Sequence, residues 1–92
     1  MLISNLLKHD KNVQDIVLKL SQSLKDDECM FAFYSKLGGI RFKKIKTNKK
    51  PQYRKGGALY LTDRKLSSFK EVKLLGQVIQ VMKREQAWTN KN

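Results

Sequence analysis

The sequence has few of the residues that form covalent cross-links or metal sites. It contains one cysteine, one histidine and one proline. A single cysteine cannot form an internal disulfide, and one thiol with one distant imidazole is not a metal-binding set. A membrane span needs roughly 20 consecutive apolar residues, which the chain does not contain. We therefore expect no disulfide scaffold, no metal and no membrane span, with a reducing cytoplasm as the natural setting.

Catalytic groups are also scarce. His9 is an isolated imidazole, and Cys29 lies in the apolar run 29–33, where a buried and unreactive thiol is expected. The glycine pairs at 38–39 and 56–57 precede expected strands, whereas a phosphate-binding loop leads into a helix. The sequence therefore predicts no catalytic residue, no cofactor and no small-molecule substrate, and it disfavours an enzyme.

The chain length allows one small domain. Its 92 residues fall just below the about 100–150 that single domains usually have. Within one basic domain, 1–92, the composition suggests a helical region at 1–27, a sheet region at 28–63 that includes a basic loop at 47–57, a C-terminal helix at 64–88 and a tail at 89–92.

Apolar residues at helical spacing predict one helix over 12–25. The spacing follows the 3.6-residue period of a helix that packs one face on a core. Asn12 is the expected N-cap, with Ser4 as an earlier alternative start. The apolar stripe consists of Val13, Ile16, Val17, Leu20 and Leu24.

The middle of the chain predicts three strands. Residues 29–34 and 40–46 flank Gly38-Gly39, a pair that supplies the positive φ of a tight hairpin turn. The apolar and polar alternation slips at Lys44-Ile45, which predicts a bulge or the strand end there. A short third strand covers 58–62, with Leu59 and Leu61 directed inward and Tyr60 outward.

The last element reads as a second helix over 68–86. Ser68 and Glu71 have the spacing of a capping box, and apolar residues follow at helical spacing. Gly76 either permits close helix packing or argues for a strand. Together the elements predict the α+β class: an αβββα order with a three-stranded antiparallel sheet, both helices on one face and the other face open.

Positive charge is concentrated in the middle of the chain. The 20 Lys and Arg outnumber 8 Asp and Glu, for a net charge of +12. Residues 1–30 contain four Lys and five acids, and residues 56–92 contain seven cations and three acids. Residues 31–55 contain nine cations and no acid. Most of the excess charge therefore lies on a predicted strand and the loop that follows it.

Such a cluster is typical of a site for a polyanion, because phosphates replace the counterions that the cations otherwise hold. The alternatives are an acidic protein surface, an anionic lipid surface and a solvated face that serves solubility. Lysine contacts phosphate as a point charge, which favours recognition of backbone and shape over sequence. Tyr34 and Tyr60 are candidates to stack on bases. The expected nucleic-acid-binding residues, with RNA favoured over DNA, are Arg41, Lys43, Lys44, Lys46, Lys49, Lys50, Tyr53, Arg54 and Lys55.

The element order, the size and two local segments resemble the small Alu-domain subunits of the signal recognition particle. The segments are Phe33-Tyr34-Ser35-Lys36-Leu37-Gly38-Gly39-Ile40 and Tyr60-Leu61-Thr62-Asp63, which leads into Phe69-Lys70-Glu71-Val72. The resemblance implies a ribonucleoprotein subunit that dimerises through its sheet and binds RNA on a basic concave surface. The double-stranded-RNA-binding domain shares the element order, but its basic helix start is echoed only by Arg64, Lys65 and Lys70.

A second resemblance leads to an alternative function. Gly39-Ile40-Arg41-Phe42-Lys43-Lys44-Ile45 and Val72-Lys73-Leu74-Leu75-Gly76-Gln77-Val78-Ile79-Gln80-Val81-Met82-Lys83 are similar to the C-terminal domain of the LexA and phage-repressor Ser-Lys peptidases. In that family the second segment is a strand, Lys43 would match the catalytic lysine and Ser4 the serine. Asn5 stands where the family has Met, so the resemblance implies a degenerate regulatory or dimerisation module. A small phage-type inhibitor that occupies a host factor's nucleic-acid site is a further alternative.

Overall fold

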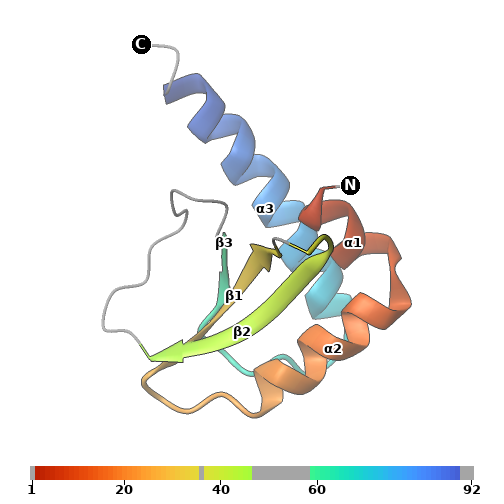
Figure 1. The fold of residues 1–92 in the computed structure, drawn as a ribbon, viewed down its shortest axis with the longest axis vertical. Helices are drawn as coiled ribbons and strands as arrows, with labels where there is room; N and C mark the ends of the chain where they lie inside the picture. Colours follow the sequence, from red (N-terminus) through yellow and green to blue (C-terminus); the bar gives the residue numbers. More distant parts are fainter. Residues whose placement is uncertain (1, 36, 47–58, 90–92) are drawn as a thin grey trace.

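The structure, a computed structural model, describes residues 2–35, 37–46 and 59–89, with side chains up to Val81. Figure 1 shows three helices and three strands. In chain order they are α1 (Ile3–His9), α2 (Lys11–Gln22), β1 (Glu28–Tyr34), β2 (Ile40–Lys46), β3 (Leu59–Thr62) and α3 (Phe69–Thr89).

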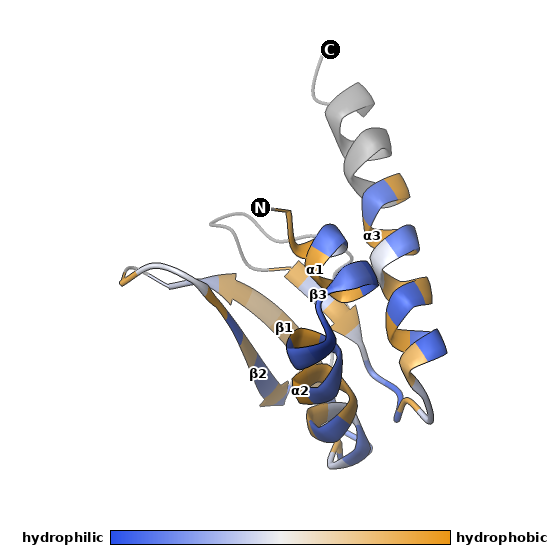
Figure 2. Cartoon of the chain, turned by 90° about the vertical axis from the view of Figure 1, so that its right-hand side faces the viewer, coloured by the Kyte–Doolittle hydropathy of each residue, from blue (hydrophilic) through white to orange (hydrophobic). Residues whose placement is uncertain are grey.

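The strands form one antiparallel sheet in the order β2-β1-β3, so β1 is central. The helices pack on one face of this sheet (Figure 2). The predicted α+β class, the three-stranded antiparallel sheet and the placement of the helices on one face are confirmed. All three helices and two strands contribute to a single hydrophobic core, which consists of Ile3, Leu7, Val17, Leu24, Met30, Ala32, Leu59, Leu61, Leu66, Val72 and Ile79.

The first third of the chain forms two helices, where the sequence predicted one. Asp10 separates them with an extended backbone, and its Oδ1 accepts hydrogen bonds from the amides of Asn12 (2.9 Å) and Val13 (3.2 Å). Asp10, and not Asn12, is therefore the N-cap of α2. A side chain that accepts from the free amides of a helix start favours an extended backbone at its own position, and this ends α1 where α2 begins. Ile16, a member of the predicted stripe, is 47% exposed.

α3 continues as a helix through Gly76, so the strand alternative for this segment is not observed. Gly76 is buried where α3 meets α1. A Cβ at this position would lie 2.7 Å from the carbonyl oxygen of Ser4 and 3.2 Å from the Cβ of Leu7. Lys8 Nζ donates a hydrogen bond across the same contact to Gln80 Oε1 (2.8 Å). The missing side chain of Gly76 thus allows the close helix packing that the sequence left open.

The start of α3 differs slightly from the predicted capping box. Glu71 reaches back as expected, but its carboxylate accepts from the amide and the hydroxyl of Ser67, each at 2.9 Å, one residue before Ser68. These two hydrogen bonds lower the pKa of Glu71 because they favour its ionised form. The carboxylate therefore ties the connection that precedes α3 to the first turn of the helix.

The β1–β2 hairpin turns at Gly38 and Gly39, whose φ angles are 91° and 89°. The pairing is regular from Tyr34↔Ile40 to Glu28↔Lys46, so the irregularity predicted at Lys44-Ile45 does not occur. Ile45 lies opposite Cys29 on the sheet face away from the helices. Because this end of that face is also apolar, the alternation breaks without a bulge. The irregularity that does occur lies between Met30 and Phe31 in the β1–β3 pairing.

Candidate nucleic-acid interface

The sheet face that points away from the helices carries cations and aromatic rings together; we call it the helix-free face. In antiparallel pairs, directly opposed residues share a face. Arg41 lies opposite Phe33, and Lys43 lies opposite Phe31. On the other side of β1, Tyr60 also lies opposite Phe31. The three strands therefore place two cations of β2 and one ring of β3 beside the aromatic residues of β1.

On this face, the ring of Phe31 contacts the rings of both Phe33 and Tyr60. Phe31 stacks on Phe33 with ring centroids 6.4 Å apart, and it meets Tyr60 edge to face at 5.7 Å. Such arrangements match the quadrupoles of the rings and add about 0.5–1.5 kcal/mol per pair beyond burial. The cluster thus joins β1 and β3 through the buried ring of Phe31, with the half-buried rings of Phe33 and Tyr60 on either side of it.

Tyr60 is held as a neutral phenol. Its partial burial raises its pKa, and the nearby Asp63 carboxylate, which accepts a hydrogen bond from the phenol, raises the pKa further. The hydroxyl therefore keeps its proton to a higher pH than an ordinary tyrosine does.

The helix-free face is accessible only in part, which corrects the expectation that it is open. Cys29 and Phe31 are buried on it at 2% and 1% exposure. The buried thiol itself was predicted and is confirmed. Arg41 and Lys43 are exposed, and Phe33 and Tyr60 are half-buried. The usable surface is therefore the part around these last four side chains.

Two further cations of β2 point to the opposite face. Lys44 lies opposite the core residue Met30, and its Nζ donates to the carbonyl of Ser23 (3.4 Å). Lys46 lies opposite Glu28 and forms an ion pair with Asp27 at 3.9 Å. The structure thus does not bring these two lysines together with Arg41 and Lys43. Strand alternation separates cations that are adjacent in the sequence.

The two tyrosines proposed to stack on bases are also separated. Tyr34 has the parity of Met30 and Ala32, so it lies on the helix-side face at the end of β1, where it is 52% exposed. Tyr60 lies on the helix-free face. Only Tyr60 therefore shares a face with Arg41 and Lys43.

The remaining predicted residues lie outside the described part of the chain. They are Lys49, Lys50, Tyr53, Arg54 and Lys55, which belong to the predicted basic loop at 47–57.

Phe33 is a residue of this face that was not singled out from the sequence. The signal was present, because the glycine pair at the hairpin turn sets the register that places Phe33 opposite Arg41. Reading the register across the turn would have identified an aromatic residue beside a cation.

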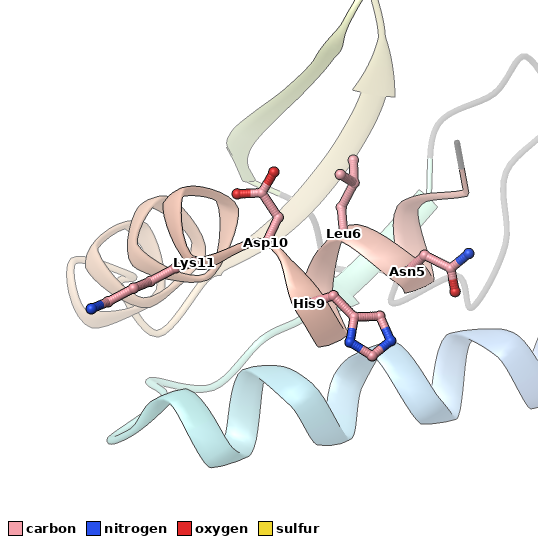
Figure 3. A pocket seen from close by; sticks show the side chains of 5 residues that line it. All are labelled: Asn5, Leu6, His9, Asp10 and Lys11. Carbon is pink, nitrogen blue, oxygen red and sulfur yellow. The ribbon is translucent and has the colours of Figure 1, made fainter.

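A pocket at the junction of α1 and α2 does not form a comparable site. It is lined by Asn5, Leu6, His9, Asp10 and Lys11. Figure 3 shows that His9 points toward α3, whereas Leu6 and Asp10 point to the other side of the helices and Lys11 points outward. The Asp10 carboxylate is engaged in capping α2. His9 and Asp10 therefore do not converge on a common point.

The described residues also show neither a metal-binding cluster nor a membrane-spanning helix. Within 2–35, 37–46 and 59–89, no group of three or more His, Cys, Asp or Glu side chains is placed to hold a metal ion. In the same part of the chain, no helix combines the length and the apolar character that crossing a membrane requires.

No protein-family model, no curated protein and no solved structure matches this chain.

Proposed function

We propose that this protein binds nucleic acid, with single-stranded RNA favoured over DNA, and that its helix-free face contributes to the contact. The observation that carries the proposal is the juxtaposition of Arg41 and Lys43 with Phe33 and Tyr60 on one sheet face. The role is non-catalytic in this proposal. Binding would place phosphates at the cations and bases at the rings.

The cations supply most of the affinity in this mechanism. Arg41 and Lys43 are exposed and alternate along β2, so they lie about 7 Å apart along the strand. This spacing is close to the distance between successive phosphates in an extended nucleic-acid strand. Each phosphate that is neutralised releases condensed counterions, which makes binding favourable and dependent on salt.

The aromatic rings favour a single strand. Bases in a duplex are stacked on one another and present only their edges, whereas bases in single-stranded RNA can be splayed out and stack on protein rings. Each stacked base contributes about 1–3 kcal/mol and tolerates any base identity. Phe33 and Tyr60 are half-buried, so their sheet-facing sides are fixed while part of each ring stays accessible.

The test is a titration of a fluorescein-labelled 20-nucleotide single-stranded RNA, followed by anisotropy at two salt concentrations. An RNA duplex and a DNA duplex of the same length serve as comparisons. We expect the single-stranded RNA to bind most tightly and its affinity to fall as salt rises. Arg41→Ala with Lys43→Ala should weaken binding at least tenfold and reduce the salt slope by about 1.4, since each single-strand phosphate contributes about 0.7.

The matched control is Lys11→Ala with Lys25→Ala, which removes the same charge from exposed positions outside the sheet. This variant should lose much less affinity than the β2 variant. Phe33→Ala should weaken binding with no change in the salt slope, because stacking releases no counterions. Absence of RNA binding at low salt, or equal losses in the β2 variant and the control, would refute the proposal.

A further inference from the structure

A groove runs between the connection that follows β3 and the first turns of α3. Its volume is about 360 Å³. The apolar part is formed by three leucines and a valine, and the lip carries two cations. The lining residues are Thr62, Arg64, Lys65, Leu66, Glu71, Leu74, Leu75 and Val78.

The apolar side of the groove belongs to an exposed stripe on α3. Leu74, Val78 and Val81 are exposed by 49%, 53% and 54%. Their spacing of four and three residues places them on one line along the helix. The line extends for about 10 Å at 1.5 Å per residue. Solvent-exposed apolar residues that are scattered need no explanation, whereas a continuous line beside a groove marks an interaction surface.

The groove is held in shape by hydrogen bonds of its own walls. The amide of Leu66 donates to Ser21 Oγ (3.1 Å), and Gln22 Nε2 donates to the carbonyl of Leu66 (3.3 Å). The amide of Arg64 donates to Thr62 Oγ1 (3.0 Å). These bonds fix the connection against α2 and β3. A partner would therefore meet a preformed surface and would lose less free energy to ordering.

The charge of the groove is positive. Arg64 and Lys65 are exposed on its lip, and Lys70 is exposed one turn before Leu74 on the same line of α3. Glu71 is the one acid among the described lining residues, and its two oxygens already accept hydrogen bonds from Ser67. An acidic partner would find complementary charge here. A second copy of this chain, with its net charge of +12, would be repelled.

We propose that this groove binds an acidic amphipathic helical segment of a partner protein. The segment would place apolar side chains on Leu74, Val78 and Val81 and carboxylates at Arg64, Lys65 and Lys70. A helix laid along an exposed helix face packs its apolar ridge into the groove of its neighbour. The proposal does not depend on nucleic-acid binding, because it uses none of the residues of the helix-free face.

The probe for this proposal is a synthetic 18-residue peptide with leucines at helical spacing and glutamates on the other face. A second peptide keeps the glutamates and replaces the leucines by serine, and a third keeps the leucines and replaces the glutamates by lysine. Binding of each labelled peptide to the full chain is measured by anisotropy at physiological salt. We expect the first peptide to bind at least tenfold more tightly than either of the others.

The location is tested with Leu74→Ser combined with Val78→Ser, two exposed changes that leave the core residues in place. This variant should bind the first peptide at least tenfold more weakly. Ile16→Ser is the matched control, since Ile16 is equally exposed on α2, and Arg41→Ala with Lys43→Ala tests the other face. Both should retain peptide binding. The circular dichroism of every variant is compared with that of the parent chain.

Three outcomes would overturn the proposal. The first is equal binding of the leucine and the serine peptides, which would show attraction by charge alone. The second is unchanged peptide affinity in the α3 variant. The third is a dimer of the parent chain in sedimentation that dissociates on Leu74→Ser with Val78→Ser, which would make a second copy the occupant. None of these outcomes bears on RNA binding, so the two proposals fail separately.

Discussion

Gly76 is the residue that permits the contact between α1 and α3. A Cβ at this position would meet the backbone carbonyl oxygen of Ser4 at 2.7 Å, and backbone cannot move aside as a flexible side chain can. In an exposed helix, replacing glycine by alanine stabilises by about 1 kcal/mol. Here the steric cost of overpacking, about 1–3 kcal/mol, opposes that gain.

We therefore predict that Gly76→Ala lowers the free energy of unfolding, and that Gly76→Leu lowers it further. The measurement is urea denaturation followed by circular dichroism. Gln77→Ala, at an exposed neighbouring position of α3, is the control and should be neutral or slightly stabilising. If the free energy of unfolding of Gly76→Ala instead rose by about 1 kcal/mol, as helix propensity alone predicts, the close contact between Gly76 and α1 would be contradicted.

Ser4 lies in the same helix contact with an unsatisfied hydroxyl. The residue is fully buried, and its Oγ has no hydrogen-bond partner among the described residues. An unpaired buried polar group costs about 1–3 kcal/mol. Ser21 is equally buried, but its Oγ donates to the carbonyl of Leu18 (2.8 Å) and accepts from the amide of Leu66 (3.1 Å).

We predict that Ser4→Ala is neutral or stabilising, whereas Ser21→Ala destabilises by about 1–2 kcal/mol because it leaves the amide of Leu66 unpaired. The midpoints of urea denaturation of the two variants and the parent chain decide this. If both variants lost the same amount of stability, the Ser4 hydroxyl would have a hydrogen-bond partner in solution.

At the scale of elements, the Ser67–Glu71 hydrogen bonds at the start of α3 make a pH-dependent contribution to the stability of the fold. The hydrogen bonds from Ser67 lower the pKa of Glu71 in the folded chain relative to the unfolded chain. A carboxyl group with a lowered folded pKa stabilises the fold at pH values above its unfolded pKa. That stability is lost as the pH falls through the lowered folded pKa, below the ordinary glutamate value of about 4.3.

We predict that the melting temperature of Glu71→Gln falls less between pH 6 and pH 3 than that of the parent chain. Thermal unfolding at a series of pH values provides the comparison. Asp26→Asn, which removes an exposed acid from the connection between α2 and β1, is the matched control. If the melting temperatures of the parent chain and Glu71→Gln fell in parallel as the pH is lowered, the assigned role of Glu71 would be contradicted.

The elements also show how far sequence reasoning reaches. Helical spacing, the glycine pair of the hairpin and the short apolar strands correctly placed α2, α3 and the three strands to within a few residues. The break at Asp10 was missed because apolar periodicity cannot distinguish one long helix from two that meet at a cap. The regular pairing at Ile45 was missed because alternation assumes one apolar face, whereas both faces of β1 are apolar near Cys29.

At the scale of the molecule, the two proposed surfaces use different side chains and come closest at β3, where Arg64 of the groove lip lies near enough to Tyr60 to affect its pKa. Figure 2 shows β1 and β2 at one side of the view and α3 at the other, whereas β3 lies close to α3. The helix-free face points away from the helices, and the stripe of Leu74, Val78 and Val81 is exposed on α3. The β2 part of the helix-free face, with Arg41 and Lys43, would thus be accessible while the stripe of α3 is occupied.

We predict that the chain binds the labelled RNA and the acidic amphipathic peptide at the same time. Saturating peptide should change the RNA dissociation constant by less than about threefold at physiological salt, where the Debye length is about 8 Å. The serine-substituted peptide controls for the effect of added negative charge. Competitive displacement of RNA by the leucine peptide would show that the two ligands share one surface.

The sequence by itself determined the class of fold, the order of the strands along the chain and the concentration of positive charge in residues 31–55. These features depend on local periodicity and composition, which do not require knowing which distant segments of the chain pack together. Only the tertiary structure decided which cations share a face. The pairing with β1 directs Arg41 and Lys43 away from the helices and Lys44 and Lys46 toward them.

Only the tertiary structure, likewise, decided which stripe of α3 is exposed. Leu74, Val78 and Val81 are apolar residues at helical spacing, and such spacing predicts an apolar line but not what covers it. The close packing of α1 at Gly76 fixes which side of α3 is buried. The opposite side is left with apolar side chains in solvent, and burial of this kind depends on contacts between segments far apart in the chain.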